Sequence, residues 1–141
     1  MPPAPSPPTR RWLAPALAAA TIAFTGLLVY ATHHPRPEEL LGPNPPTDKT
    51  LHVAAYATLA SLATATWLTA RRTKHRGVTM LAVALAVFGG LDEVTQPFFN
   101  RDAEPLDWLY DCVGIAIGLA AVSALFALAR RPAAGHPAGD Q

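Results

Sequence analysis

Polar side chains that could carry chemistry occur at the ends of long apolar runs in this sequence. Asp48, His52 and Tyr56 follow one another at intervals of four residues, and Lys49 lies three residues before His52. This spacing places all four side chains on nearly the same face of a helix. A histidine in such a group can act as a general acid or base, and a lysine can contact a phosphate or carboxylate.

Two further groups of polar residues have helical spacing as well. Glu93 and Gln96 are three residues apart, Asp107 and Asp111 are four residues apart, and Arg101 lies between the two pairs. A carboxylate beside a histidine can orient the imidazole or carry a second proton. The three groups therefore contain the parts of an acid–base site or of a site for a charged ligand.

Four long runs with few charges must position these groups. They cover Trp12 to Ala31, Leu51 to Ala70, Val78 to Phe99 and Leu106 to Ala129. Twenty helical residues span about 30 Å, which is enough to cross the hydrocarbon core of a bilayer. Only 15% of the residues are charged, against about 25% in typical globular chains. We therefore predict an all-α polytopic membrane protein, a bundle of four transmembrane helices.

Basic and acidic residues are divided unevenly between the two sides of this predicted bundle. Eight Lys and Arg residues lie before the first run, between the second and third, or after the fourth. The other side holds three Lys and Arg residues and nine of the ten Asp and Glu residues. Because an excess of Lys and Arg marks the cytoplasmic side, we expect both termini in the cytoplasm and the polar groups outside, in a multi-pass plasma-membrane protein.

The chain can be divided along these runs. We expect residues 1–11 and 130–141 to be disordered, residues 12–31 to form the first membrane helix and residues 32–50 to form an external loop. Residues 51–129 then hold the other three helices, with the polar motif beginning at residue 48. Cleavage after Ala31 as a signal peptide is an alternative, but twenty apolar residues exceed the roughly 7–15 of a usual signal core.

Charged groups inside a membrane restrict how the helices can face. A charge at the centre of a span costs about 2.5–3.5 kcal/mol, so we expect Glu93 and Asp111 to point into the bundle. Gly114 and Gly118, on the same stripe as Asp111, predict close approach of a neighbouring helix. The polar groups should then share one outward-facing pocket. The alternative is a purely structural polar cap, with Asp48 and Asp107 as N-caps of their helices.

A family resemblance rests on the same residues. The pattern resembles the VanZ-like family of small bacterial membrane proteins in these positions: Asp48, Lys49, His52, Tyr56, Glu93, Gln96, Arg101, Asp107, Gly114 and Gly118. It covers about half of the chain, and it departs from the family at Asp111, where asparagine is usual. The resemblance implies an envelope membrane protein; the family is named after a protein linked to reduced teicoplanin susceptibility. It implies no particular reaction.

Two functions follow for the predicted pocket. In the first, it binds an amphiphile, either a membrane lipid or a lipid-linked envelope molecule, through Asp48, Lys49, Tyr56, Gln96, Arg101 and Asp107, and Trp108 packs against the apolar part with Tyr56. Lys49 and Arg101 would contact a phosphate or carboxylate. In the second, it is an intramembrane enzyme acting on a lipid-linked substrate, with the catalytic residues His52, Glu93 and Asp111. A metal-dependent form of this enzyme would use His52, Glu93, Asp107 and Asp111 as ligands.

Other classes of function are disfavoured by composition. The single cysteine, Cys112, excludes an intramolecular disulfide, and the chain has no compact metal motif, so we assign neither a metal site nor a cofactor. A net charge of +1 without a basic tract argues against binding to nucleic acid. The inner halves of the runs carry few polar groups, which disfavours a proton-coupled transporter. The small residues Gly114 and Gly118, which allow close helix packing, are compatible with a homo-oligomer.

Overall fold

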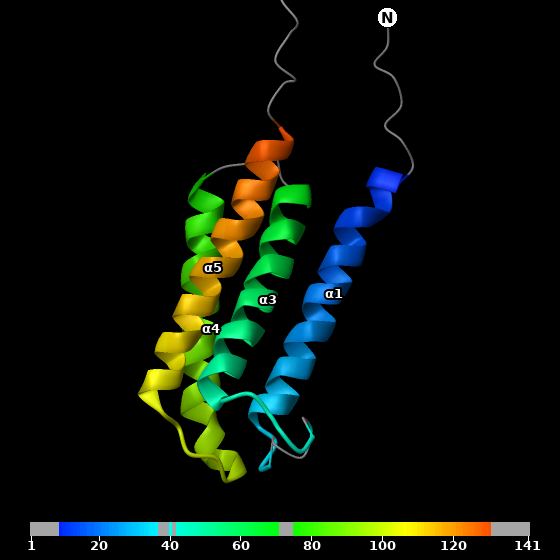
Figure 1. Ribbon diagram of the computed structural model, residues 1–141. Helices are drawn as coiled ribbons and strands as arrows, with labels where there is room; N and C mark the ends of the chain where they lie inside the picture. The colour runs from blue at the N-terminus through cyan, green and yellow to red at the C-terminus, as the bar shows by residue number, and fades with distance from the viewer. Residues whose placement is uncertain (1–8, 37–39, 41, 71–74, 131–141) are drawn as a thin grey trace, which may run out of the picture.

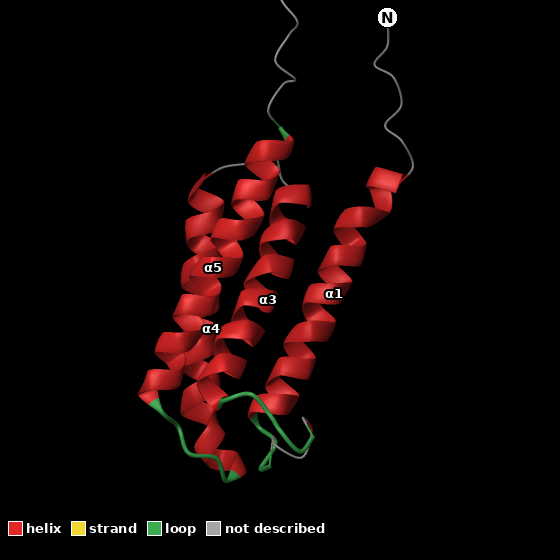
Figure 2. Ribbon diagram, viewed as in Figure 1, coloured by secondary structure: helices red, strands yellow, loops and turns green. Residues whose placement is uncertain are grey.

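Four long helices run side by side through the molecule (Figure 1). They are α1 (Thr9–Thr32), α3 (Asp48–Ala70), α4 (His75–Thr95) and α5 (Pro105–Ala129), and a 3-10 helix, η1 (Gln96–Phe99), follows α4. The structure is a computed structural model that describes residues 9–36, 40, 42–70 and 75–130. Within these residues there is no strand (Figure 2), and all four helices are long and apolar enough to cross a membrane. The predicted all-α bundle of four membrane-length helices is confirmed.

Asp48 and Asp107, the N-caps expected in the structural alternative, do not occupy the N-cap positions of their helices. Thr47 precedes α3, and its hydroxyl accepts a hydrogen bond from the Thr50 amide at 3.4 Å. The N-cap of α5 is Glu104. Asp48 and Asp107 instead lie in the first turns of their helices, so the N-cap assignment was wrong for both. The helix dipole still favours a carboxylate in a first turn.

The remaining helix ends follow local chemistry. α1 begins at Thr9, three residues before the predicted start, so that Pro15 lies inside the helix. Pro97 in η1 has no amide hydrogen to continue the bonding of α4. Asn100 then takes a left-handed backbone conformation with φ of 58°, which asparagine tolerates better than most residues. The predicted disordered segments fall mostly on residues 1–8 and 131–141, outside the described residues.

Helix α3 is the centre of the bundle, because it contacts each of the other three helices. Its closest packing is against α5, where two glycines leave room for the α3 backbone. A side chain on Gly114 would meet the carbonyl oxygen of Val53, and one on Gly118 would lie 2.9 Å from the Cβ of Ala60. The two glycines therefore bring the first turns of α3 and α5, with their polar residues, close together.

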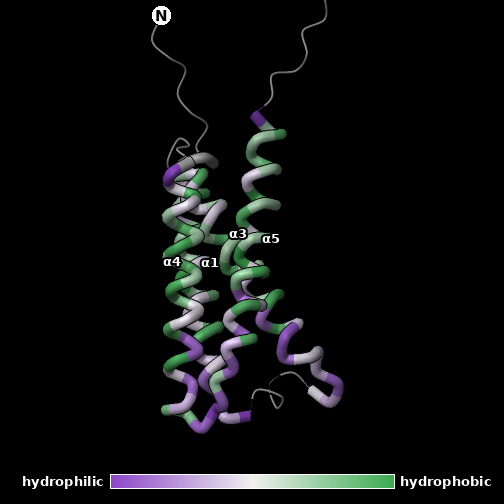
Figure 3. Tube along the Cα trace, turned by 90° about the vertical axis from the view of Figure 1, so that its left-hand side faces the viewer, coloured by the Kyte–Doolittle hydropathy of each residue, from purple (hydrophilic) through white to green (hydrophobic). Residues whose placement is uncertain are grey.

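The outward faces of the helices are apolar. On α4, one stripe at helical spacing is more than half exposed and consists of Met80, Val83, Val87, Leu91 and Val94. Contiguous apolar surface of this extent suits contact with lipid chains. Hydrophilic residues instead gather at one end of the bundle (Figure 3), where α1 ends and α3 and α5 begin; we call this the pocket end. The start of α1 and the end of α5 lie together at the opposite end (Figure 1).

Candidate functional site

The imidazole of His52 lies at the centre of the pocket end. It projects from the second turn of α3 and is 5% exposed. Its Nδ1 atom lies 2.8 Å from Asp111 Oδ1 on α5 and 3.8 Å from Glu93 Oε1 on α4. With Asp111 ionised, its carboxylate can only accept a hydrogen bond, and Nδ1 is then the donor. The imidazole thus joins three helices.

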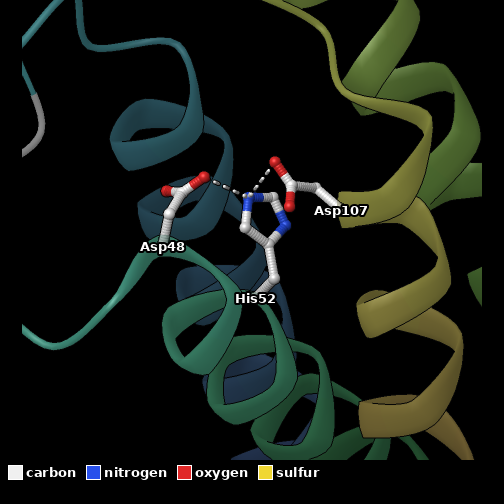
Figure 4. A group of neighbouring side chains, drawn as sticks. All are labelled: Asp48, His52 and Asp107. Atoms are coloured by element: carbon white, nitrogen blue, oxygen red, sulfur yellow. Dashed lines mark ion pairs between the residues drawn. The ribbon is translucent and has the colours of Figure 1, made fainter.

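The other ring nitrogen faces two more carboxylates. His52 Nε2 lies 3.9 Å from Asp48 Oδ2 and 4.0 Å from Asp107 Oδ2 (Figure 4). Asp48 is four residues before His52 on α3, and Asp107 reaches across from the first turn of α5. Both distances exceed the roughly 2.7–3.2 Å of a hydrogen bond from nitrogen to oxygen. A gap is therefore left between Nε2 and the two carboxylates.

Several carboxylate oxygens at this site are buried without a hydrogen-bond partner among the described residues. They are Glu93 Oε2, Asp107 Oδ1 and Asp111 Oδ2. The Asp111 side chain is fully buried, and that of Asp107 is 5% exposed. Most buried polar atoms in proteins have a partner, so such a concentration of unpaired oxygens at one place requires a cause.

Two cations lie at the rim of the pocket end, and both face carboxylates. Lys49 Nζ lies 3.4 Å from Glu104 Oε2 and 3.7 Å from Asp107 Oδ1. The Arg101 guanidinium lies 3.9 Å from Asp48 Oδ1. These two cations face a site with five carboxylates, those of Asp48, Glu93, Glu104, Asp107 and Asp111. Carboxylates therefore outnumber these cations at the pocket end by five to two.

A second polar network, which the sequence analysis missed, joins α1 to α4. Asp92 is 4% exposed and accepts hydrogen bonds from the Thr32 hydroxyl at 3.1 Å and the Tyr56 hydroxyl at 3.5 Å. His33 Nδ1 lies 3.6 Å from the same carboxylate, and His33 Nε2 lies 2.9 Å from the Thr95 hydroxyl. The sequence feature that could have indicated this network is the pair Thr32 and His33 at the end of the first apolar run.

The structure places the predicted site residues around His52, in the Asp92 network, or away from the pocket. His52, Glu93 and Asp111 meet directly, with Asp48 and Asp107 on the other side of the ring. Gln96 supports this group, because its amide donates a hydrogen bond to Glu93 Oε1 at 3.2 Å. Tyr56 instead belongs to the Asp92 network. Trp108 lies away from the pocket, and its indole donates to the Ala86 carbonyl of α4 at 2.9 Å.

Two cavities meet at this site. A polar cavity of about 420 Å³ lies at the pocket end and is lined by Asp48, Leu51, Arg101, Asp102, Glu104 and Asp107, among others. A mostly apolar cavity of about 150 Å³ lies beside it and is lined by Leu28, Ala31, Leu51, His52, Ala55 and Tyr56, among others. Asp48, Leu51 and Arg101 line both cavities. One wall therefore joins a polar space to an apolar one.

Comparisons with protein-family models, curated proteins and solved structures find no match to this chain. The resemblance to the VanZ-like family accordingly rests on the motif residues alone and stays a prediction.

Proposed function

We propose that this chain is an envelope membrane protein whose pocket end binds the polar head of an amphiphile, a membrane lipid or a lipid-linked envelope molecule. The neighbouring apolar cavity would take a short part of the hydrocarbon chain. The observation that carries this proposal is the wall that the two cavities share, formed by Asp48, Leu51 and Arg101. An amphiphile is the ligand class that fills a polar space and an adjoining apolar space at once.

The position of the two cavities supports the same ligand. Both lie at the end of the candidate membrane spans, where lipid heads would meet lipid chains if these helices cross a bilayer. The apolar cavity is lined by Leu28 and Ala31 of α1 and by Ala55 of α3, so a ligand there would lie between two helices that face lipid. Location in the plasma membrane and a link to glycopeptide susceptibility belong to this proposal through the VanZ-like resemblance.

The experiment tests whether the shared wall is where the ligand binds. We expect native mass spectrometry of the full chain from detergent to retain lysophosphatidylglycerol on the wild type. Leu51→Trp should abolish retention, because an indole at residue 51 fills the junction of the two cavities. Ala54→Trp, one turn along on the exposed side of α3, is the matched control and should bind as the wild type does. Equal retention by the Leu51 and Ala54 variants would contradict the proposal.

A second function is favoured by one specific contact. The 2.8 Å hydrogen bond between His52 Nδ1 and Asp111 Oδ1 orients the imidazole so that Nε2 faces Asp48 and Asp107, two residues that line the polar cavity. A histidine–carboxylate pair of this kind can transfer protons. In this alternative, the site is that of an intramembrane enzyme acting on the head of a lipid-linked substrate. His52 would be the acid or base, and Asp111 would position it, with Glu93 as a second proton carrier.

A further inference from the structure

The two nitrogens of His52 have different surroundings. With Asp111 ionised, Nδ1 is the donor of the 2.8 Å hydrogen bond, and in the neutral imidazole Nε2 then presents a lone pair. That lone pair faces the carboxylates of Asp48 and Asp107 at 3.9 and 4.0 Å. A lone pair directed at two negative groups is repulsive unless a positive charge lies between them.

The gap at Nε2 is wider than a shared proton needs. A protonated Nε2 would donate at about 2.7–3.2 Å, which neither carboxylate satisfies. Two atoms that bind one metal ion at about 2.1 Å, and about 90–109° apart, are separated by about 3.0–3.4 Å. Inward movements of about 0.5 Å by the half-exposed Asp48 side chain and of about 0.6 Å by Asp107 would bring both carboxylates to about 3.4 Å from Nε2.

A second observation concerns the Asp107 carboxylate, whose Oδ2 atom faces Nε2. Asp107 is 5% exposed, and its Oδ1 atom has no hydrogen-bond partner among the residues that the structure describes. Lys49 Nζ lies 3.7 Å from this oxygen, which is beyond hydrogen-bond distance. One nitrogen and two carboxylate atoms of Asp48, His52 and Asp107 lie within 4.8 Å of one another.

We propose that Asp48, His52 and Asp107 bind a divalent metal ion, with His52 Nε2 as the nitrogen ligand. Imidazole with carboxylates suits ions such as Zn²⁺ and Mn²⁺. Asp111 then acts as a positioning residue, since histidines that bind metals commonly donate the other N–H to a carboxylate. Because Asp48 and Asp107 line the polar cavity, positions on the ion stay open to water or a ligand.

The second group of ligand atoms, on His52, Glu93 and Asp111, fits a metal less well. The 2.8 Å between Nδ1 and Asp111 Oδ1 is shorter than the roughly 3.0 Å expected between two ligands of one ion. This group is also fully buried, whereas the Asp48–Asp107 side opens on the polar cavity. The geometry thus favours the Nε2 side.

The metal site goes beyond the proposed function. Lys49 and Arg101 already place positive charge at the pocket end, and a divalent ion held by the carboxylates would strengthen the binding of a phosphate head further. The metal site itself requires no amphiphile, so the two proposals can fail separately. Leu51→Trp leaves all three ligands in place and should bind zinc as the wild type does, even where it excludes the lysolipid.

The test is calorimetric titration of Zn²⁺, and separately of Mn²⁺, into the full chain in an uncharged detergent. We expect one ion per chain for the wild type. His52→Gln and Asp107→Asn should each weaken binding about 100-fold or more, because each removes a direct ligand. Asp111→Asn should weaken it about 10-fold to 100-fold by loosening the imidazole. Circular dichroism and gel filtration establish that each variant is folded.

Two matched controls remove similar groups that are not among the three proposed metal ligands. Glu104→Gln deletes a carboxylate that also pairs with Lys49, and His34→Ala deletes an imidazole at the end of α1; both should bind within about twofold of the wild type. Absence of binding to the wild type would overturn the proposal. So would zinc binding that survives Asp107→Asn but is lost in Glu93→Gln, because the ion would then lie on the Nδ1 side.

Discussion

His52 connects the two proposals because its ring nitrogens serve different groups. Nδ1 is held by Asp111, and Nε2 faces the polar cavity through Asp48 and Asp107. Helical spacing was enough to predict that Asp48 and His52 share a face, and the cost of membrane burial predicted that Asp111 points inward. Which nitrogen meets which carboxylate depends on the angle between α3 and α5, and this angle is not encoded in the spacing of either helix.

A substitution of Lys49 distinguishes two hypotheses about this residue. Lys49 either competes with a metal ion for Asp107 or contacts an anionic ligand itself. If the carboxylates hold a metal, Lys49 competes with it for Asp107, from which it lies 3.7 Å away. Lys49→Met should then raise zinc affinity about twofold, because an exposed ion pair is weak and its loss frees the Asp107 carboxylate. Calorimetry measures the change.

Lys49→Arg is the control for this prediction, because it keeps the charge and should leave zinc affinity nearly unchanged. A fall in affinity in Lys49→Met would contradict the competition. It would favour the sequence-based expectation that Lys49 itself contacts an anionic ligand. In the structure, both Lys49 and Arg101 face carboxylates, so that contact stays a prediction.

At the scale of the helices, the packing of α3 against α5 determines whether the site can form. Gly114 and Gly118 let the backbone of α3 approach α5, and Asp111 and Asp107 lie on the turns just before Gly114. This contact could be predicted in part, because two small residues four apart are typical of close helix pairs. The partner helix could not be predicted, since alanine is abundant in every run.

Gly114→Ala tests this contact. Its methyl group would meet the carbonyl oxygen of Val53 and would lie 2.9 Å from the amide nitrogen of Ala57, and backbone atoms cannot rotate away. We expect a loss of about 1–3 kcal/mol in the free energy of unfolding, measured by titration with sodium dodecyl sulfate. Gly26→Ala on α1 meets nothing within 4 Å and is the control; equal stability of the two variants would contradict the packing.

The hydrogen bonds that link α1 to α4 could not be predicted from the sequence. Thr32, Tyr56 and Asp92 come from three helices, and their hydrogen bonds depend on where the end of α1 lies relative to α4. Sequence spacing relates residues on one helix only. Asp92 directly precedes Glu93 in the sequence, but adjacent residues point about 100° apart on a helix and therefore face different partners.

On the scale of the whole molecule, polar and apolar surfaces are separated by position along the bundle. Hydrophilic residues gather at the pocket end, and the middle of the bundle is mostly hydrophobic (Figure 3). Both cavities lie at the pocket end. Composition and charge-poor runs were sufficient to predict this architecture, because backbone in lipid must satisfy its own hydrogen bonds. The excess of Lys and Arg at the opposite end predicts that the pocket end faces away from the cytoplasm.

Cysteine labelling in intact cells tests whether the pocket end opens to the outside of the cell, as expected for a bundle that spans the membrane. In a Cys112→Ala background, Leu51→Cys places a thiol on the wall that the two cavities share, and Ala70→Cys places one at the opposite end of α3. We predict that a membrane-impermeant maleimide labels residue 51 from outside and residue 70 only after permeabilisation. Labelling in the reverse pattern, or no labelling of residue 51 under either condition, would contradict the account.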